Sequence, residues 1–338
     1  MLQIKNKTPF VTEIVPSLDK NEHEFATVII KGSFLISPKK KELSISEEPV
    51  PVTLADQFYG EPGSSSITYA SDTAFTKKGT DVVMIGHAFT RRDKEPFVDV
   101  TLQAGSLAKS VRVFGDRHWY KFLGMWKKSP PKPFEKMALC YEHAFGGKDA
   151  SDPDPARHDY EKRNPVGKGF CISNKNGGLE GLCLPNLEDP RSLMESWKDK
   201  PAPAGFGFIG PDWMPRITYA GTYDQKWREK RCPLLPEDFD ERFSNSAAPD
   251  LISRNFLKGG EEVRISGASP TGDVVFHLPE KRIHVELLLR GKRDSAEARL
   301  DTVIIEPDGN RVLITWRAVM PVFRQFIYID HVIIQERK

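Results

Sequence analysis

Hydrophobic and polar residues alternate along the first part of the chain, and this period of two predicts β-strands. The clearest case is 98–113, where mostly alternating apolar positions flank the short turn Ala104-Gly105-Ser106. Two alternating runs on either side of a glycine turn are typical of a β-hairpin. Further strands are expected at 24–36 and 81–89, because both segments are rich in apolar residues.

The last part of the chain shows the same pattern. Alternation over 274–278 and 283–289 predicts two strands, and 326–335 predicts a final one. Two more, at 301–306 and 311–317, flank Pro307-Asp308-Gly309-Asn310, where proline presets φ and glycine or asparagine accepts a positive φ. These features favour an antiparallel meander. A parallel doubly wound sheet would need long helical patterns between the strands, and the sequence has none.

The middle segment, 125–255, has a different composition. It holds 15 of the 26 prolines and four of the six tryptophans. A disordered linker would be poor in aromatic residues, so we expect ordered, irregular structure packed on the β regions. Two short helices are predicted, one from Asp189-Pro190 to about Lys198 and one to about Lys230, opened by the capping-box pair Thr222 and Gln225.

The predicted fold is therefore mainly β, with two antiparallel β-sandwich-like lobes joined by a long Pro/Gly-rich irregular segment that carries a few short helices. The N-terminal β lobe is expected over 1–124 and the C-terminal β lobe over 256–338, with 125–255 packed on both. Helix is expected for fewer than about one fifth of the residues, against a usual share of about a third. A chain of 338 residues can bury a sizeable core without metals or disulfides.

Charge and composition exclude several classes of protein. The net charge of +2, from 49 basic and 47 acidic residues, argues against nucleic acid as the main partner, and the basic clusters at 39–41, 91–92 and 228–231 are interpreted as solvated surface. No segment approaches the roughly 20 apolar residues of a membrane helix, and the N-terminus lacks the apolar region of a signal peptide. We expect a soluble, cytoplasmic protein without a membrane partner. Its four cysteines lack C-x-x-C spacing, which favours reduced thiols over a zinc site.

Motifs that carry chemistry are sparse. Neither a phosphate-binding loop nor a G-x-S-x-G elbow occurs, and the glycines of 164–169 are interpreted as a turn. Ser106 and Lys109 match S-x-x-K, but they stand in a predicted hairpin instead of opening a helix. We therefore predict no catalytic residue and no cofactor.

Two acidic regions remain as alternatives for a hydrolase that acts on glycan or peptide. A metal site is conceivable in a stretch of two histidines and four carboxylates, namely Glu142, His143, Asp152, Asp154, His158 and Asp159. Because H-E-x-x-H spacing is missing, an exposed loop is favoured and no metal is predicted. Carboxylates near an aromatic ring suit glycan hydrolysis, as for Asp224 near Trp227 or Asp238 with Asp240, but helix capping explains Asp224 better.

Two further groups of residues have a structural or binding interpretation. The turn after the first hairpin is expected to be held by an Asp116–Arg117 ion pair above Trp119, and Trp316 with Arg317 is expected to form a matching corner. In 205–214, aromatic residues flanked by glycine indicate either tight packing or a partner-binding hot spot. The candidate anchors there are Phe206, Phe208, Trp213 and Met214.

The order of the motifs resembles a bacterial family of unknown function, DUF2169. The resemblance rests on 115–117, 141–147, 164–169, 184–188, 221–224, Trp227, 233–240, 248–250, 301–303 and 316–318. It implies an adaptor or chaperone of type VI secretion that binds a toxic effector in the cytoplasm, stabilises it and helps load it onto the secretion spike. The implied partners are that effector and the spike protein that carries it. The resemblance implies no catalytic residue.

Overall fold

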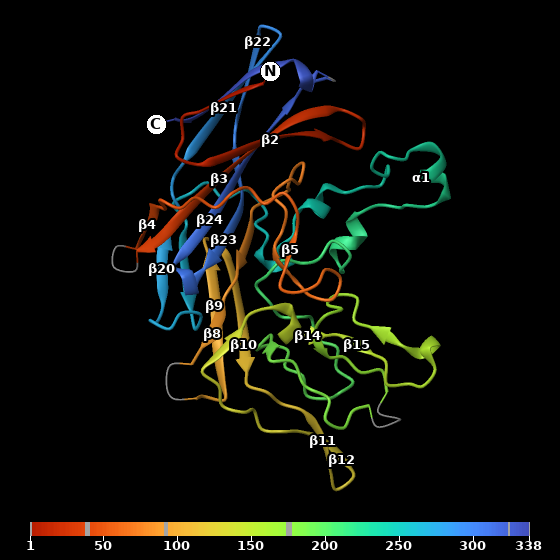
Figure 1. Ribbon diagram of the computed structural model, residues 1–338. Helices are drawn as coiled ribbons and strands as arrows, with labels where there is room; N and C mark the ends of the chain where they lie inside the picture. The colour runs from red at the N-terminus through yellow and green to blue at the C-terminus, as the bar shows by residue number, and fades with distance from the viewer. Residues whose placement is uncertain (1, 38–40, 91–93, 174–177, 324, 338) are drawn as a thin grey trace.

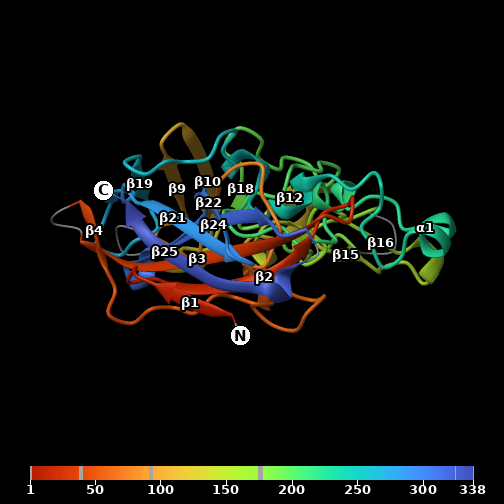
Figure 2. The ribbon, with the colours of Figure 1, turned by 90° about the horizontal axis from the view of Figure 1, so that it is seen from above.

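The computed structural model describes residues 2–37, 41–90, 94–173, 178–323 and 325–337. It is mainly β, as predicted, with 43% of residues in strands and 9% in helices, so the prediction of little helix is confirmed. Figures 1 and 2 show the large sheets on one side of the molecule and the irregular middle segment on the other. Within the described residues, no helix combines the length and the apolar character needed to cross a bilayer.

The central sheet has six strands taken from both ends of the chain. They are β2 (Val11–Leu18), β3 (Glu24–Ser37), β24 (Arg311–Pro321), β23 (Arg299–Glu306) and β7 (Asp81–Met84), with β4 (Glu42–Ile45) paired to β3. β3 pairs antiparallel with β24 over the whole length of β24. Residues 26–34 of β3 are all buried, because both faces of the sheet are covered there. This explains why the strand is an apolar run instead of an alternating one.

A five-stranded sheet lies beside the central one and contains the predicted hairpin. Its strands, in order, are β18 (Leu187–Glu188), β10 (Leu107–Phe114), β9 (Phe97–Ala104), β19 (Glu262–Ser266) and β20 (Val274–His277). Ala104 pairs with Leu107 across a two-residue turn, in which Gly105 has a φ of +56°. The hairpin prediction over 98–113 is thus confirmed.

A four-stranded sheet joins the two chain ends. Its strands, in order, are β1 (Gln3–Asn6), β25 (Ile329–Arg337), β21 (Arg282–Leu289) and β22 (Lys292–Glu297). β25 begins three residues later than the predicted 326–335, because Phe326–Tyr328 form a 3₁₀ turn. Two long-range pairs, β1 with β25 and β7 with β23, are parallel, so the sheets are mixed and not purely antiparallel.

Strands from 1–124 and from 256–338 share all three large sheets. The boundaries at 124 and 256 therefore mark a change in sequence pattern and do not separate two lobes with sheets of their own. The physical reason is long-range pairing: β3 finds its neighbour in β24 and β9 finds one in β19. Alternation along one strand carries no information about such a partner.

The single α-helix of the described residues is α1 (Gln225–Lys230), and the remaining helical turns are 3₁₀. Asp224 caps α1 by accepting from the Trp227 amide at 2.8 Å, whereas Thr222 bonds to Asp238, so the expected capping box does not form. The helix predicted over 189–198 is absent. Asp189 accepts from the Arg191 amide at 2.9 Å and ion-pairs with the Arg191 side chain, which closes a turn instead. The 3₁₀ turns are η1 (Tyr141–His143), η2 (Pro155–Arg157), η4 (Arg216–Tyr219), η5 (Glu241–Ser244), η6 (Pro249–Leu251), η7 (Pro307–Gly309) and η8 (Phe326–Tyr328).

The middle segment is ordered and holds a second, smaller core, in line with the expectation from its tryptophans. Its buried members are Trp119, Phe145, Phe170, Cys171, Leu179, Leu184 and Met194, with Trp126 and Trp197 packed against them. The structure also contains short two-stranded pairs outside the three large sheets. They are β11 (Trp119–Phe122) with β12 (Met125–Lys128), β13 (Lys136–Ala138) with β8 (His87–Phe89), β14 (Phe145–Gly146) with β17 (Lys168–Gly169), β15 (Lys148–Asp149) with β16 (Asp159–Tyr160), and β5 (Gln57–Phe58) with β6 (Ile67–Tyr69).

The central sheet carries three buried ion pairs. Lys31 pairs with Asp72 at 2.7 Å, Lys77 with Asp81 at 2.8 Å, and the Arg317 Nε donates to Asp301. All six side chains are at most 5% exposed. Asp81 also accepts from Asn245 and Ser246, so one carboxylate joins the central sheet to the middle segment. We refer to these three pairs as the buried ion-pair layer.

Candidate functional site

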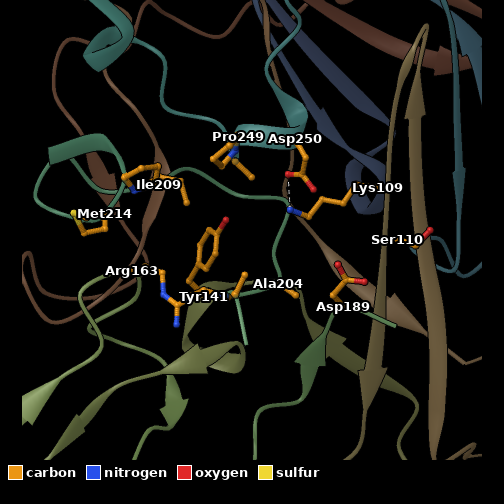
Figure 3. A pocket seen from close by; sticks show the side chains of 14 residues that line it. Lys109, Ser110, Tyr141, Arg163, Asp189, Ala204, Ile209, Met214, Pro249 and Asp250 are labelled. Atoms are coloured by element: carbon orange, nitrogen blue, oxygen red, sulfur yellow. Dashed lines mark hydrogen bonds and ion pairs between the residues drawn. The ribbon is translucent and has the colours of Figure 1, made fainter. Parts of the chain in front are cut away.

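Two adjoining cavities form a groove where the middle segment meets the sheets, and Figure 3 shows the first of them. The first encloses about 270 Å³ and the second about 350 Å³. Ile209, Pro215 and Pro249 line both cavities, so the two are halves of one feature with a common wall. We call it the middle-segment groove.

The lining of the first cavity is rigid and largely apolar. Its apolar members are Tyr141, Ala202, Pro203, Ala204, Ile209, Met214, Pro215, Ala248 and Pro249. Proline and alanine lose little conformational freedom when a partner covers them, so a surface of this kind binds with a small entropic penalty. The composition suits an extended, partly apolar chain better than a small polar molecule.

Tyr141 stands in the middle of the first cavity. Its side chain is 2% exposed, and its ring packs edge-on against Trp213 at 5.7 Å. Gly205 permits this packing, since a Cβ there would lie 2.8 Å from the Tyr141 ring. Figure 3 shows the hydroxyl directed toward Pro249.

The Tyr141 hydroxyl is a hydrogen-bond donor available to a ligand. Burial, and secondarily the negative charge of Asp250, raise the pKa of Tyr141, so the hydroxyl keeps its proton. None of the residues in the described ranges gives that hydroxyl a hydrogen-bond partner. A backbone carbonyl of an incoming chain would accept this proton well.

An ion pair lies at the mouth of the first cavity. Lys109 reaches from β10 to Asp250 in η6, with 2.8 Å between Nζ and Oδ1 (Figure 3). The Lys109 side chain is 11% exposed, whereas that of Asp250 is 48% exposed. The lysine therefore closes the wall of the cavity, while the carboxylate stays open to solvent and to a partner.

The second cavity is held together by Arg216. Its guanidinium donates to the carbonyl oxygens of Phe243 at 2.9 Å and Ile209 at 2.8 Å, and lies over the Phe243 ring. Burial lowers the pKa of Arg216. Within the described part of the chain, no carboxylate pairs with Arg216 or with the exposed Arg254, which also lines this cavity. This half of the groove therefore has cationic groups in reach of a negatively charged partner.

The predicted aromatic anchors lie in the core and not on this surface. Phe206, Phe208 and Trp213 are at most 5% exposed, and Met214 is half-buried at the edge of the first cavity. The segment is fixed by backbone bonds, among them Met84 N to Phe206 O at 3.0 Å. Tight packing is thus the correct interpretation of the glycine–aromatic pattern for the three aromatic residues. Their replacement by polar residues would disturb the fold.

The predicted corner at 115–119 forms with a different partner. Asp116 is exposed, whereas Arg117 is buried and pairs with Glu188 at 2.5 Å. Arg117 also donates to the Pro185 carbonyl and lies over the Phe114 ring, 3.7 Å from its centre. The expected Asp116–Arg117 pair is therefore wrong, because β18 brings Glu188 beside β10.

The other predicted structural residues are placed as packing residues. Trp119 belongs to the second core, and Trp316 is 1% exposed and stacks on Phe10 at 5.2 Å. Arg317 belongs to the buried ion-pair layer. The corner at 316–317 thus resembles that at 117–119 in having a buried arginine next to a buried tryptophan.

The predicted acidic stretch is divided between two environments. His143 is half-buried and bonds to Asn186 at 3.0 Å, whereas His158 lies in an exposed loop and bonds to the Asp152 carbonyl. In the described ranges, no three potential metal ligands come together. Asp224 and Asp240 cap helical turns, and Asp238 accepts from Thr222. Lys39, Lys40, Arg91 and Arg92 of the basic clusters lie outside the described residues.

Of the residues that line the groove, sequence reasoning proposed Met214 as a binding residue and missed Tyr141, Lys109 and Asp250. Tyr141 and Asp250 belong to motifs noted above, and Lys109 was considered only as part of S-x-x-K. Nothing in their local sequence shows that η1, β10 and η6 meet in space. The signal that was available is the occurrence of 141–147 and 248–250 in one ordered series of motifs.

Comparison with known proteins identifies a family. No match was found among curated proteins, and none among solved structures. The sequence model of one family, described as an uncharacterized protein conserved in bacteria (DUF2169), matches residues 21–317. This range includes every residue that lines the groove, and the chain belongs to this family.

Proposed function

We propose that the protein is an adaptor that binds a type VI secretion effector in the cytoplasm, stabilises it and helps load it onto the secretion spike. The observation that carries this proposal is the middle-segment groove, a rigid apolar channel with charged residues at its mouth. The resemblance of the motif series to such adaptors supplies the biological setting. Binding alone would fulfil this role.

The groove suits an extended segment of the effector. Apolar side chains would fill the first cavity, and a backbone carbonyl would accept from the Tyr141 hydroxyl. Acidic groups further along would approach Arg216 and Arg254 in the second cavity. Apolar contact supplies most of the affinity in such an arrangement, and the charges fix direction and register.

A deletion strain tests the proposed role. Removing the protein should lower the cellular level and the secretion of one effector, and that effector should copurify with the intact protein from the native host. If effector levels and secretion are unchanged in the deletion strain, and no effector copurifies, the adaptor role is wrong.

Blocking the groove tests the proposed surface. Ala202 is exposed and lines the first cavity, so Ala202→Trp would fill the cavity without entering the core. We expect effector affinity to fall at least about tenfold, since each 1.4 kcal/mol of lost contact corresponds to a factor of ten. Ala108→Trp is the matched control, because Ala108 is also exposed but does not line the groove. Equal affinities of the two variants would place the binding surface elsewhere.

A further inference from the structure

The β11–β12 hairpin projects from the lower end of the molecule in Figure 1. The side chains at its tip are apolar and exposed. Phe122 is 47%, Leu123 83% and Met125 58% exposed. Leu123 and Gly124 form the turn with φ values of +48° and +80°. Asparagine or aspartate before glycine is the usual choice in such a turn, and leucine is disfavoured in this conformation. Neither backbone geometry nor burial in the free protein accounts for a leucine there.

The base of the hairpin is anchored, so the tip is presented rigidly. Trp119 is 2% exposed in the second core, and its amide and carbonyl bond to Leu182 and Gly181 at 2.9 Å each. At the other strand, Lys128 Nζ donates to the Met194 carbonyl at 2.8 Å and pairs with Glu195. A fixed apolar tip loses little conformational entropy on contact with a partner.

The hairpin itself is basic. The hairpin 119–128 contains three lysines and no acidic residue. Lys127 lies over the Phe122 ring at 4.7 Å and Lys121 over the Trp126 ring at 5.9 Å. Glu180 accepts from the Lys121 backbone amide at 3.1 Å, but among the residues that the structure describes no carboxylate forms a salt bridge with the ammonium group of Lys121 or Lys127. The hairpin therefore combines an apolar tip with two ammonium groups, those of Lys121 and Lys127, that lie over the rings of Trp126 and Phe122.

We propose that this hairpin is a lipid-contacting element that inserts Leu123 and its neighbours into the surface of an anionic bilayer. Apolar residues at the tip would enter the acyl boundary while Lys121 and Lys127 meet the negatively charged headgroups. A protein partner is less suited to this feature, because a stable interface buries about 800 Å² on each side and needs a matching pocket. A bilayer needs no such match. Peripheral contact of this kind is also independent of a membrane-spanning segment.

Vesicle sedimentation with the full-length protein tests the proposal. The wild type should sediment with vesicles of phosphatidylglycerol and phosphatidylethanolamine and stay in solution with phosphatidylcholine vesicles. Leu123→Asn removes the apolar side chain but keeps the turn, because asparagine accepts a positive φ. Its partition onto the anionic vesicles should fall at least about tenfold, the factor expected for one lost leucine insertion. Ile327→Asn is the control, since Ile327 is 81% exposed but lies outside the hairpin.

The lysines give a second, independent measurement. Lys121→Ala combined with Lys127→Ala should weaken binding to the anionic vesicles, and the difference from the wild type should shrink as salt is raised. The proposal is overturned if the wild type does not bind the anionic vesicles, which is the result expected for a tip that docks into a protein. Equal binding by Leu123→Asn and the wild type, or an equal loss in Ile327→Asn, would overturn it as well.

Discussion

The buried ion-pair layer and the middle-segment groove both contain lysine–carboxylate pairs. In the layer, Lys77 and Asp81 are 5% and 0% exposed at 2.8 Å. In the groove, Lys109 and Asp250 keep the same distance with 11% and 48% exposure. The geometry is alike and the access to water differs.

That difference gives the two regions different roles. A fully buried pair has already lost its hydration, so removing one partner leaves an uncompensated charge in the core. The open carboxylate of the groove loses its water only when another molecule covers it, so its energy enters binding and not folding. We therefore expect substitutions in the layer to change stability and substitutions in the groove to change affinity.

Asp81→Ala should have the largest effect on stability. Asp81 accepts from Lys77 Nζ at 2.8 Å, from Asn245 Nδ2 at 2.8 Å and from the Ser246 amide at 2.9 Å. Its loss would leave the buried Lys77 ammonium without a countercharge, although Lys77 still donates to Thr302 and Asn245 to the Gly79 carbonyl. The Ser246 amide would lose its acceptor. We expect a loss of roughly 3–5 kcal/mol in the free energy of unfolding, measured by urea denaturation.

The matched control for this prediction is Asp99→Ala. Asp99 pairs with Arg112 through two bonds on the surface of β9 and β10, and its side chain is 44% exposed. Its removal should cost less than about 1 kcal/mol. If both variants lose the same stability, exposure does not separate the two kinds of pair.

The neighbouring residues Arg117 and Asp116 give a second comparison between a buried and an exposed charged side chain. Arg117→Ala would strand the buried Glu188 carboxylate and remove the contact with Phe114, for a loss at the lower end of about 3–5 kcal/mol. Asp116→Ala should cost less than about 1 kcal/mol, because Asp116 is exposed and accepts one bond from Asn186 at 3.2 Å. Thermal melting of the two variants measures the difference. A larger effect of Asp116→Ala would contradict the assignment of Glu188 as the partner.

The sequence pattern predicted where the strands lie, but it did not predict which strands pair or which side chains meet across them. The hairpin of β9 and β10 could be predicted because alternation and a glycine turn are local features. Glu188 could not be predicted as the partner of Arg117, because the two meet only through the pairing of β18 with β10. The same limit applies to β3 and β24, whose pairing depends on the whole fold.

The candidate site shows this limit more strongly. The aromatic residues of 205–213 stood out in the sequence, yet the same apolar character that drew attention to them drives them into the core. Tyr141, Lys109 and Asp250 lie on three elements far apart in the chain, and each is unremarkable in its local sequence. Local structure also has ambiguous cases. Asp189-Pro190 suits a helix start and a turn equally well, and the structure has the turn.

The smallest effect we predict concerns His143, which lies next to Tyr141 in η1. Burial lowers the pKa of His143, and nearby Lys168 acts in the same direction, while the bond to Asn186 opposes them. The folded-state pKa is thus below the ordinary value of about 6.5, so the unfolded chain binds the proton more readily. Stability should therefore fall as the pH drops below about 6.5.

His143→Asn should flatten that pH dependence, measured by urea denaturation between neutral pH and the onset of acid unfolding. One proton contributes at most about 1.4 kcal/mol per pH unit, so the difference in slope must stay below this limit. His158→Asn is the control for the substitution itself, because His158 lies in an exposed loop. An unchanged slope in His143→Asn would show that protonation of this buried histidine does not distinguish the folded from the unfolded chain.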